Sequence, residues 1–144
     1  MNVFATTPSQ RQLGVGLLIL RLALGLVFLV HGGQKLFVMG MAGTGDMLAQ
    51  MGAPAASLTG PLVAIVEPLA GALLVLGLLT RLAGLAIAFD MLGAILIYHR
   101  HHGFFIPQGI EFVMMLCAAG VALATLGAGP FSVDHALARR RGAA

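Results

Sequence analysis

The chain has 144 residues, of which 59% are hydrophobic and only 9% are charged. A water-soluble domain carries about 25% charged residues, so this composition excludes a protein whose whole surface faces water. The net charge of +3 equals the contribution of Arg139, Arg140 and Arg141 alone. Because the sequence has no basic stripe interleaved with aromatic residues, a nucleic-acid partner is not expected. The single cysteine, Cys117, excludes a self-contained Cys-x-x-Cys oxidoreductase.

The first long apolar block covers residues 13–37, and Arg21 interrupts it. A cleaved signal peptide has a continuous apolar core, so we expect this block to be retained as a membrane-spanning helix. About 20 apolar residues cross the roughly 30 Å hydrocarbon core of a bilayer, and this block is long enough. A link rich in Gly, Ala and Met follows at residues 38–57.

Three further apolar blocks lie at residues 58–79, 82–98 and 109–126. The link between the second and third blocks is very short, which predicts a tight helical hairpin. The link between the third and fourth blocks is rich in histidine and ends at Pro107. Each block is close to the length that crosses a bilayer, so the chain is expected to cross the membrane four times.

The fourth block ends at the helix-breaking run Gly127-Ala128-Gly129-Pro130. Ser132 follows, and a serine at this position can cap a helix by accepting a backbone N–H bond. The predicted fold class is therefore all-α: an integral membrane four-helix bundle with a short amphipathic C-terminal helix. No change in composition divides the chain, which predicts a single domain over residues 1–144.

The positive charges of the links predict the orientation in the membrane. With four spans, the side of both termini holds Arg11, Arg81, Arg139, Arg140 and Arg141, and the other side holds Lys35 and Arg100. Cytoplasmic loops carry an excess of lysine and arginine. We therefore expect both termini to be cytoplasmic and the histidine-rich link to face outward.

One ionisable residue stands out in each apolar block: Arg21, Glu67, Asp90 and Glu111. Inside a span such a residue costs about 2.5–3.5 kcal/mol on insertion scales, so it indicates a functional site. At about 1.5 Å per residue, the first three fall in one layer near the middle of the membrane. This layer holds one cation and two carboxyl groups, so one carboxyl group is expected to hold or exchange a proton.

We therefore predict that Arg21, Glu67 and Asp90 meet inside the bundle and act as catalytic residues. The alternative is that the three only pair with one another and hold the helices together. In either case, Arg21 is expected to reach at least one of the two carboxylates.

A second polar layer is expected near the outer ends of the helices. Its members are His31, Lys35, His99 and Glu111. His31 and Lys35 lie one helical turn apart on one face, and a histidine exchanges a proton near neutral pH. We predict that these residues bind a small anionic or quinone-like ligand between the first and fourth helices.

Side chains that suit a soft metal also gather on the outer side. They are His31, His99, His101, His102, Met39, Met41, Met47 and Met51. Imidazole and thioether are ligands for copper, but methionine is also a common filler of apolar segments. We assign no metal ligand among them, and outward-facing copper binding stays an alternative function.

Over about residues 17–137, the sequence resembles the DoxX family of small four-helix membrane proteins. The resemblance rests on Arg21-Leu22, His31-Gly32 with Lys35, Glu67-Pro68-x-x-Gly71, Gly77-Leu78-Leu79-Thr80-Arg81, Glu111-Phe112, and Gly127-x-Gly129-Pro130-Phe131-Ser132-Val133-Asp134.

The resemblance implies a bacterial inner-membrane protein that serves as the membrane subunit of a quinone-linked or thiol- or sulfur-linked redox system. It implies a protein partner, or a second copy of the chain, and allows a quinone as cofactor. The alternatives are a non-enzymatic membrane scaffold and a small-molecule permease. Copurification of a quinone or of a visible chromophore would distinguish the redox function from these alternatives.

Overall fold

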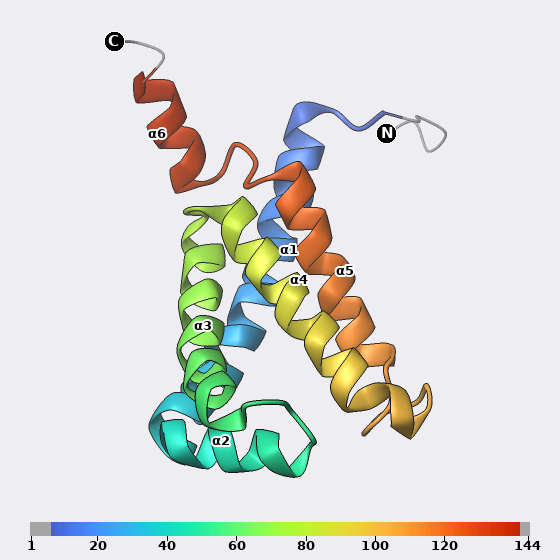
Figure 1. The fold of residues 1–144 in the computed structure, drawn as a ribbon. Helices are drawn as coiled ribbons and strands as arrows, with labels where there is room; N and C mark the ends of the chain where they lie inside the picture. Colours follow the sequence, from blue (N-terminus) through green and yellow to red (C-terminus); the bar gives the residue numbers. More distant parts are fainter. Residues whose placement is uncertain (1–6, 142–144) are drawn as a thin grey trace.

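The computed structural model of the protein describes residues 7–141, which form helices and turns and no β-strand. In chain order the elements are α1 (Gln10–Gly33), the π-helical turn η1 (Gln34–Met39), α2 (Gly40–Gln50), α3 (Ala56–Leu76), α4 (Thr80–Ile97), the 3₁₀ turn η2 (His99–His102), α5 (Glu111–Leu126) and α6 (Val133–Arg141) (Figure 1). The predicted all-α class is confirmed.

Three helical segments are long and apolar enough to cross a membrane: the continuous run Gln10–Gln50, α3 and α4. The fourth predicted block corresponds to α5, which is apolar but has only 16 residues. The link at residues 38–57 was not predicted to be helical, yet it contains α2. The expected tail helix is present as α6, and the Ser132 hydroxyl oxygen caps it by accepting the backbone N–H of His135 at 3.1 Å.

The long helices pack as two pairs. One pair is α1 with α3, and the other is α4 with α5, while the contact between α3 and α4 is smaller. The two pairs lie close together at the end that carries both termini and diverge toward the opposite end, where α2 lies across the end of α3 (Figure 1). The fold is therefore narrow at one end and open at the other.

Each pair is held at a glycine crossing. A Cβ atom added to Gly25 would lie 2.8 Å from the carbonyl oxygen of Gly71, and one added to Gly84 would lie 2.8 Å from that of Gly120. Real Cβ atoms do not approach so closely, so both crossings require glycine. Such small residues let helices in lipid gain contact through close backbone approach.

The interior is apolar except for a few polar groups. The buried cluster includes Leu17, Leu24, Phe28, Leu74, Ile87 and Leu123. Arg21 and Glu67 are nevertheless only 1% and 3% exposed. On the outside, large apolar side chains such as Ile19, Val30 and Phe89 are more than half exposed, as expected for helices that face lipid.

Candidate functional site

Lys35 and Glu67 form an ion pair between α1–η1 and α3. The Lys35 ammonium donates to Oε1 of Glu67, and this is the only salt bridge among residues 7–141. The Glu67 side chain is 3% exposed and that of Lys35 is 21% exposed. The pair is therefore largely withdrawn from solvent. Lys35, and not Arg21 as predicted, is the cation that meets Glu67 inside the bundle.

Lys35 occupies this position within the π-helical turn η1, directly after α1. A π turn changes the register of a helix and is frequent at functional sites. The fully buried Thr44 of α2 holds this turn, because its hydroxyl group lies 2.9 Å and 3.2 Å from the carbonyl oxygens of Gly40 and Lys35. The sequence interpretation missed Thr44, although a hydroxyl side chain between two glycines in a Gly-, Ala- and Met-rich link was the available signal.

Helix α1 approaches α3 most closely beside Glu67. A Cβ atom on Gly32 would lie 2.8 Å from the Cβ atom of Glu67, so only glycine fits there. Pro68 follows Glu67 and lacks the N–H group that would bond the carbonyl oxygen of Ala64. The motif His31-Gly32 thus meets the motif Glu67-Pro68 across the helix pair.

Asp90 of α4 supplies a second carboxyl group to the cluster. Its side chain lies close to the side chains of Glu67 and Lys35. The Oε2 atom of Glu67 and the Oδ2 atom of Asp90 are both buried, and neither has a hydrogen-bond donor in the described part of the chain. Two buried carboxyl groups in contact repel each other when both are ionised, whereas a single proton on one would let it donate to the other.

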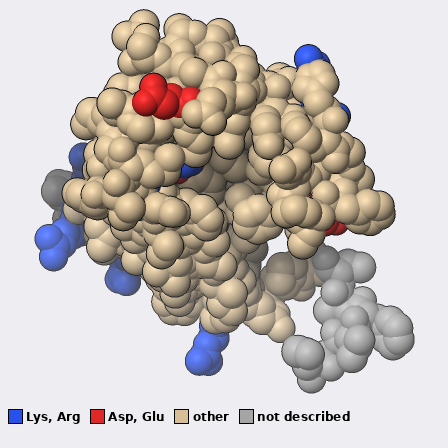
Figure 2. Space-filling view, turned by 90° about the horizontal axis from the view of Figure 1, so that it is seen from below, with Lys and Arg blue, Asp and Glu red and all other residues tan. Residues whose placement is uncertain are grey.

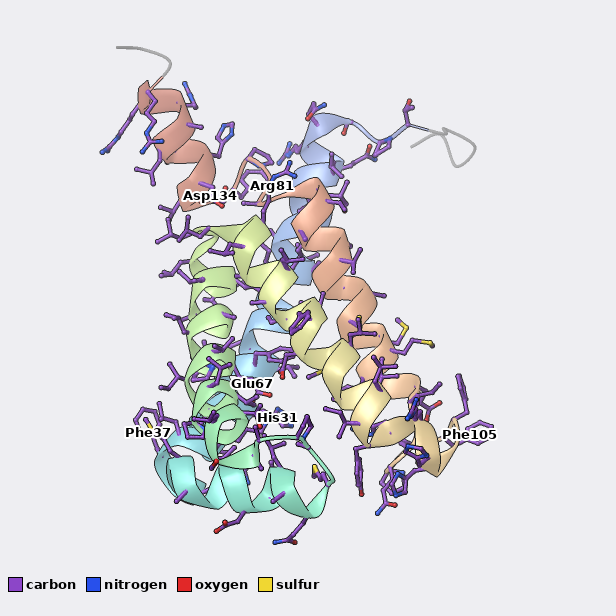
Figure 3. All side chains as sticks on the ribbon, in the orientation of Figure 1. His31, Phe37, Glu67, Arg81, Phe105 and Asp134 are labelled. Carbon is purple, nitrogen blue, oxygen red and sulfur yellow. The ribbon has the colours of Figure 1, made fainter. Side chains whose placement is uncertain are left out.

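The cluster of Lys35, Glu67 and Asp90 lies toward the open end of the fold. Figure 3 shows Glu67 between the two helix pairs, on the side of α3 that faces the interior. Seen from the α2 end, the surface is hollowed between the helices, and basic and acidic atoms are visible in the hollow (Figure 2). A small molecule could therefore approach the carboxyl groups from that end.

Arg21 does not belong to this cluster. Its buried guanidinium group donates to the carbonyl oxygens of Leu74 at 2.8 Å, Ala128 at 3.1 Å and Phe131 at 2.6 Å. These bonds join the end of α3 to the segment between α5 and α6. The Leu74 carbonyl also accepts the backbone N–H of Gly77 at 3.1 Å, so Arg21 adds a second bond there and supplies a donor to the carbonyl groups of Ala128 and Phe131.

The prediction that Arg21 pairs with Glu67 or Asp90 was wrong, because the described residues contain no such ion pair. Estimated depth placed the three residues in one layer, but the long arginine side chain turns toward the end that carries both termini. The partial negative charge at the C-terminal end of α3 attracts a cation there. Carbonyl groups replace the carboxylates as its partners.

Asp134 and Arg81 tie the same end of the molecule (Figure 3). The carboxylate of Asp134 accepts the backbone N–H groups of Leu79 at 2.8 Å and Thr80 at 2.9 Å, at the start of α4. Arg81 donates to the carbonyl oxygen of Thr125, at 2.9 Å, near the end of α5. Leu79 has a φ of 48°, which is unfavourable for a residue other than glycine, and the bond to Asp134 fixes it there.

His99 and Glu111 lie away from Lys35, in the connection between α4 and α5. The His99 Nδ1 atom lies 2.7 Å from the carbonyl oxygen of Gln108, and Oε1 of Glu111 accepts the N–H of Ile106 at 2.7 Å. Both side chains therefore hold the connection in shape. The predicted joining of His99 and Glu111 to Lys35 does not occur, because α4 and α5 diverge from α1 at this end.

His31 lies at the open end but points away from the ion pair. Its side chain is exposed, and its Nδ1 atom lies 2.9 Å from the carbonyl oxygen of Val27 in the preceding turn. The four residues predicted to form one outer ligand site are thus distributed over three places. Lys35 is inside, His31 is on the surface of α1, and the other two brace a loop.

The histidine-rich link does not form a metal centre in the described residues. No group of three or more His, Cys, Asp or Glu side chains within residues 7–141 could hold a metal ion. The Nδ1 atom of His102 lies 2.9 Å from the carbonyl oxygen of Tyr98, and His101 accepts the Nε–H of Arg100 at 3.1 Å. The His101 and His102 side chains therefore interact with neighbouring groups of the same link.

Comparison with known proteins identifies the family. The DoxX family model matches residues 16–100, a segment that contains Lys35, Glu67 and Asp90. The chain is 36% identical to an uncharacterized membrane protein of Mycobacterium tuberculosis, over 84% of this chain and 80% of that protein. It is 34% identical to the inner membrane protein YphA of Escherichia coli, over 83% and 88% of the two chains.

A third relative, from Bacillus subtilis, is named "Putative oxidoreductase CatD" and is 31% identical over 79% of this chain and 82% of its own length. No solved structure matches the chain. The family match and these relatives cover most of the helical bundle described above. The chain therefore belongs to the DoxX family of membrane proteins.

Proposed function

We propose that this protein is the membrane subunit of a quinone-linked redox system and that Lys35, Glu67 and Asp90 form its quinone site. The observation that carries the proposal is the buried cluster itself: one cation, two carboxyl groups close to each other, and two carboxyl oxygens without a donor among the described residues. A redox role is also supported by the relative from Bacillus subtilis, whose name describes an oxidoreductase.

A bound quinone accepts two electrons and two protons to become a quinol. The electrons are proposed to come from a partner protein that oxidises a thiol or sulfur compound. The Lys35 ammonium group would hydrogen-bond a quinone carbonyl oxygen and stabilise the negative charge that develops on it. Glu67 and Asp90 would deliver their shared proton to one quinone oxygen, take up a second proton through the hollow end and pass it to the other oxygen, which completes the two protons of the quinol.

The other predicted site residues have supporting roles in this proposal. Arg21 would act as a positioning residue, because it fixes α3 and thereby Glu67 relative to the other helices. His31 would exchange protons at the mouth of the hollow, where it is exposed. His99 and Glu111 would keep the mouth open by holding the connection between α4 and α5 away from α1.

The quinone site can be tested with a short-chain quinone and the purified protein in lipid nanodiscs. The quinone should raise the unfolding temperature of the wild-type protein, since a ligand at 100 times its Kd stabilises the folded state by about 2.7 kcal/mol. Asp90→Asn should reduce this shift, because it removes the carboxyl group that, when protonated, would donate a hydrogen bond to the bound quinone.

Asp46→Asn provides the matched control, since Asp46 is an exposed carboxylate on α2, and its shift should equal that of the wild-type protein. A wild-type protein whose unfolding temperature does not respond to the quinone would contradict the proposal. The scaffold and permease alternatives would then be preferred.

We further propose a single domain of residues 1–144 that crosses the bacterial inner membrane four times with both termini in the cytoplasm. Helix α5 is about 24 Å long at 1.5 Å per residue and packs along α4, which is long enough to cross. The E. coli relative is named an inner membrane protein. Both termini lie at the end that carries Arg81 and the basic helix α6 (Figure 1).

Reporter fusions test this orientation directly. A reporter that is active only in the cytoplasm should be active at the C-terminus and inactive when inserted next to Gly103, in the connection between α4 and α5. The charge bias supports this outcome. Cytoplasmic activity at Gly103 would show that the orientation is inverted or that α5 does not cross.

A further inference from the structure

An apolar groove with a basic rim lies between the end of α3 and α6. Its lining includes Leu76, Phe131, Val133 and Leu137, and Arg140 lines it as well. The four apolar side chains are 39–56% exposed. The groove lies at the end that carries both termini, far from the proposed quinone site, so it is independent of that proposal.

The charge around the groove is positive, and no carboxylate among residues 7–141 neutralises it. Helix α6 ends with Arg139, Arg140 and Arg141, and the described residues contain no carboxylate paired with any of them. The one carboxylate of α6, Asp134, has both oxygens engaged by backbone N–H groups at the start of α4. An anion in the groove would therefore meet a free guanidinium group.

The height of the groove in the membrane follows from α3. Leu76 is the last residue of this helix, which is apolar and long enough to cross the bilayer. The apolar part of the groove therefore lies at the boundary between the hydrocarbon core and the headgroups. Arg140 lies on α6, which projects beyond the bundle (Figure 1), and so reaches the level of the lipid headgroups.

We propose that this groove binds an anionic phospholipid of the adjacent leaflet. The upper part of an acyl chain would lie on Leu76, Phe131 and Leu137, and the lipid phosphate would accept hydrogen bonds from Arg140. A guanidinium group suits this role because it can donate two parallel hydrogen bonds to a phosphate. The apolar lining selects a lipid over a free phosphate, and the arginine selects an anionic headgroup over a zwitterionic one.

Native mass spectrometry of the protein released from vesicles tests the proposal. The vesicles would contain phosphatidylcholine with a minor fraction of phosphatidylglycerol, and the wild-type protein should retain phosphatidylglycerol preferentially. Arg140→Gln should reduce this preference several-fold. Arg139→Gln is the matched control, because it removes the same charge from the same helix at a position that does not line the groove, and it should have little effect.

A second variant tests the apolar lining. Leu137→Asn keeps every charge and should also reduce the retention of phosphatidylglycerol, while soluble glycerol phosphate should not displace the lipid from the wild-type protein. Leu137 is 44% exposed, so this substitution should leave the unfolding temperature unchanged.

Three results would overturn the proposal. If Arg140→Gln and Arg139→Gln reduce the preference for phosphatidylglycerol equally, α6 attracts anionic lipid only by its total charge. Displacement by glycerol phosphate would identify a site for small phosphates. A protein that retains no preferred lipid would show that the groove does not hold lipid.

Discussion

Replacement of Lys35 by methionine is expected to destabilise the folded protein by about 3–5 kcal/mol, since removal of one partner leaves a buried carboxylate without compensation. Glu67 is only 3% exposed and no other cation pairs with it among the described residues. The measurement is reversible unfolding in mixed detergent micelles, followed by circular dichroism. A loss of this size would remove much of the stability of a small domain.

The double variant Lys35→Met/Glu67→Gln distinguishes loss of charge compensation from loss of packing. It removes both charges, so it should recover most of the stability that Lys35→Met loses. It should nevertheless fail to respond to a quinone, because the cation and one carboxyl group are gone. Arg100→Met is the control for removal of an exposed cation at the same end; it should change the stability little. A stable single variant would contradict the buried ion pair.

Replacement of Arg21 by methionine is expected to cost at least about 3 kcal/mol. Each hydrogen bond from a charged group contributes about 1.5–3 kcal/mol, and Arg21 donates to three separate carbonyl oxygens from a fully buried position. Arg21→Lys should not restore the stability, because one ammonium group cannot reproduce the planar fork that spans these acceptors. The same unfolding experiment measures both variants.

Arg81→Met is the matched control, because Arg81 also donates to carbonyl groups near a helix end but is exposed; its loss should cost less than about 1 kcal/mol. The fraction of Arg21→Met that folds should still respond to the quinone, since Arg21 does not touch the cluster. Normal stability combined with loss of quinone binding would instead place Arg21 in the site and overturn its structural role.

The bonds that stabilise the fold and the proposed functional site thus lie at opposite ends of the molecule. The end with both termini is tied by Arg21, Arg81 and Asp134, and their partners are backbone groups at helix ends. The opposite end is open and holds a buried cluster whose carboxyl groups lack donors. Buried polar groups without partners are costly, and proteins retain such groups at functional sites.

The sequence alone determined the helical class, the approximate limits of the apolar helices and the capping of α6 by Ser132. These features are local, because hydropathy over about 20 residues and a cap before a helix act within one segment. The sequence also identified Glu67 and Asp90 as ionisable residues inside apolar blocks. Their proximity was predicted from similar estimated depths, which placed both in one layer near the middle of the membrane.

Only the tertiary structure decided which cation meets Glu67. The hydropathy pattern is the same for an α-helix and for one interrupted by a π turn, so the pairing of Lys35 with Glu67 left no sequence signal. That turn depends on Thr44 and on the close approach of Gly32 to Glu67. Likewise, the divergence of the helix pairs, which separates His99 and Glu111 from Lys35, is set by contacts such as the Arg21 bonds that join residues distant in the chain.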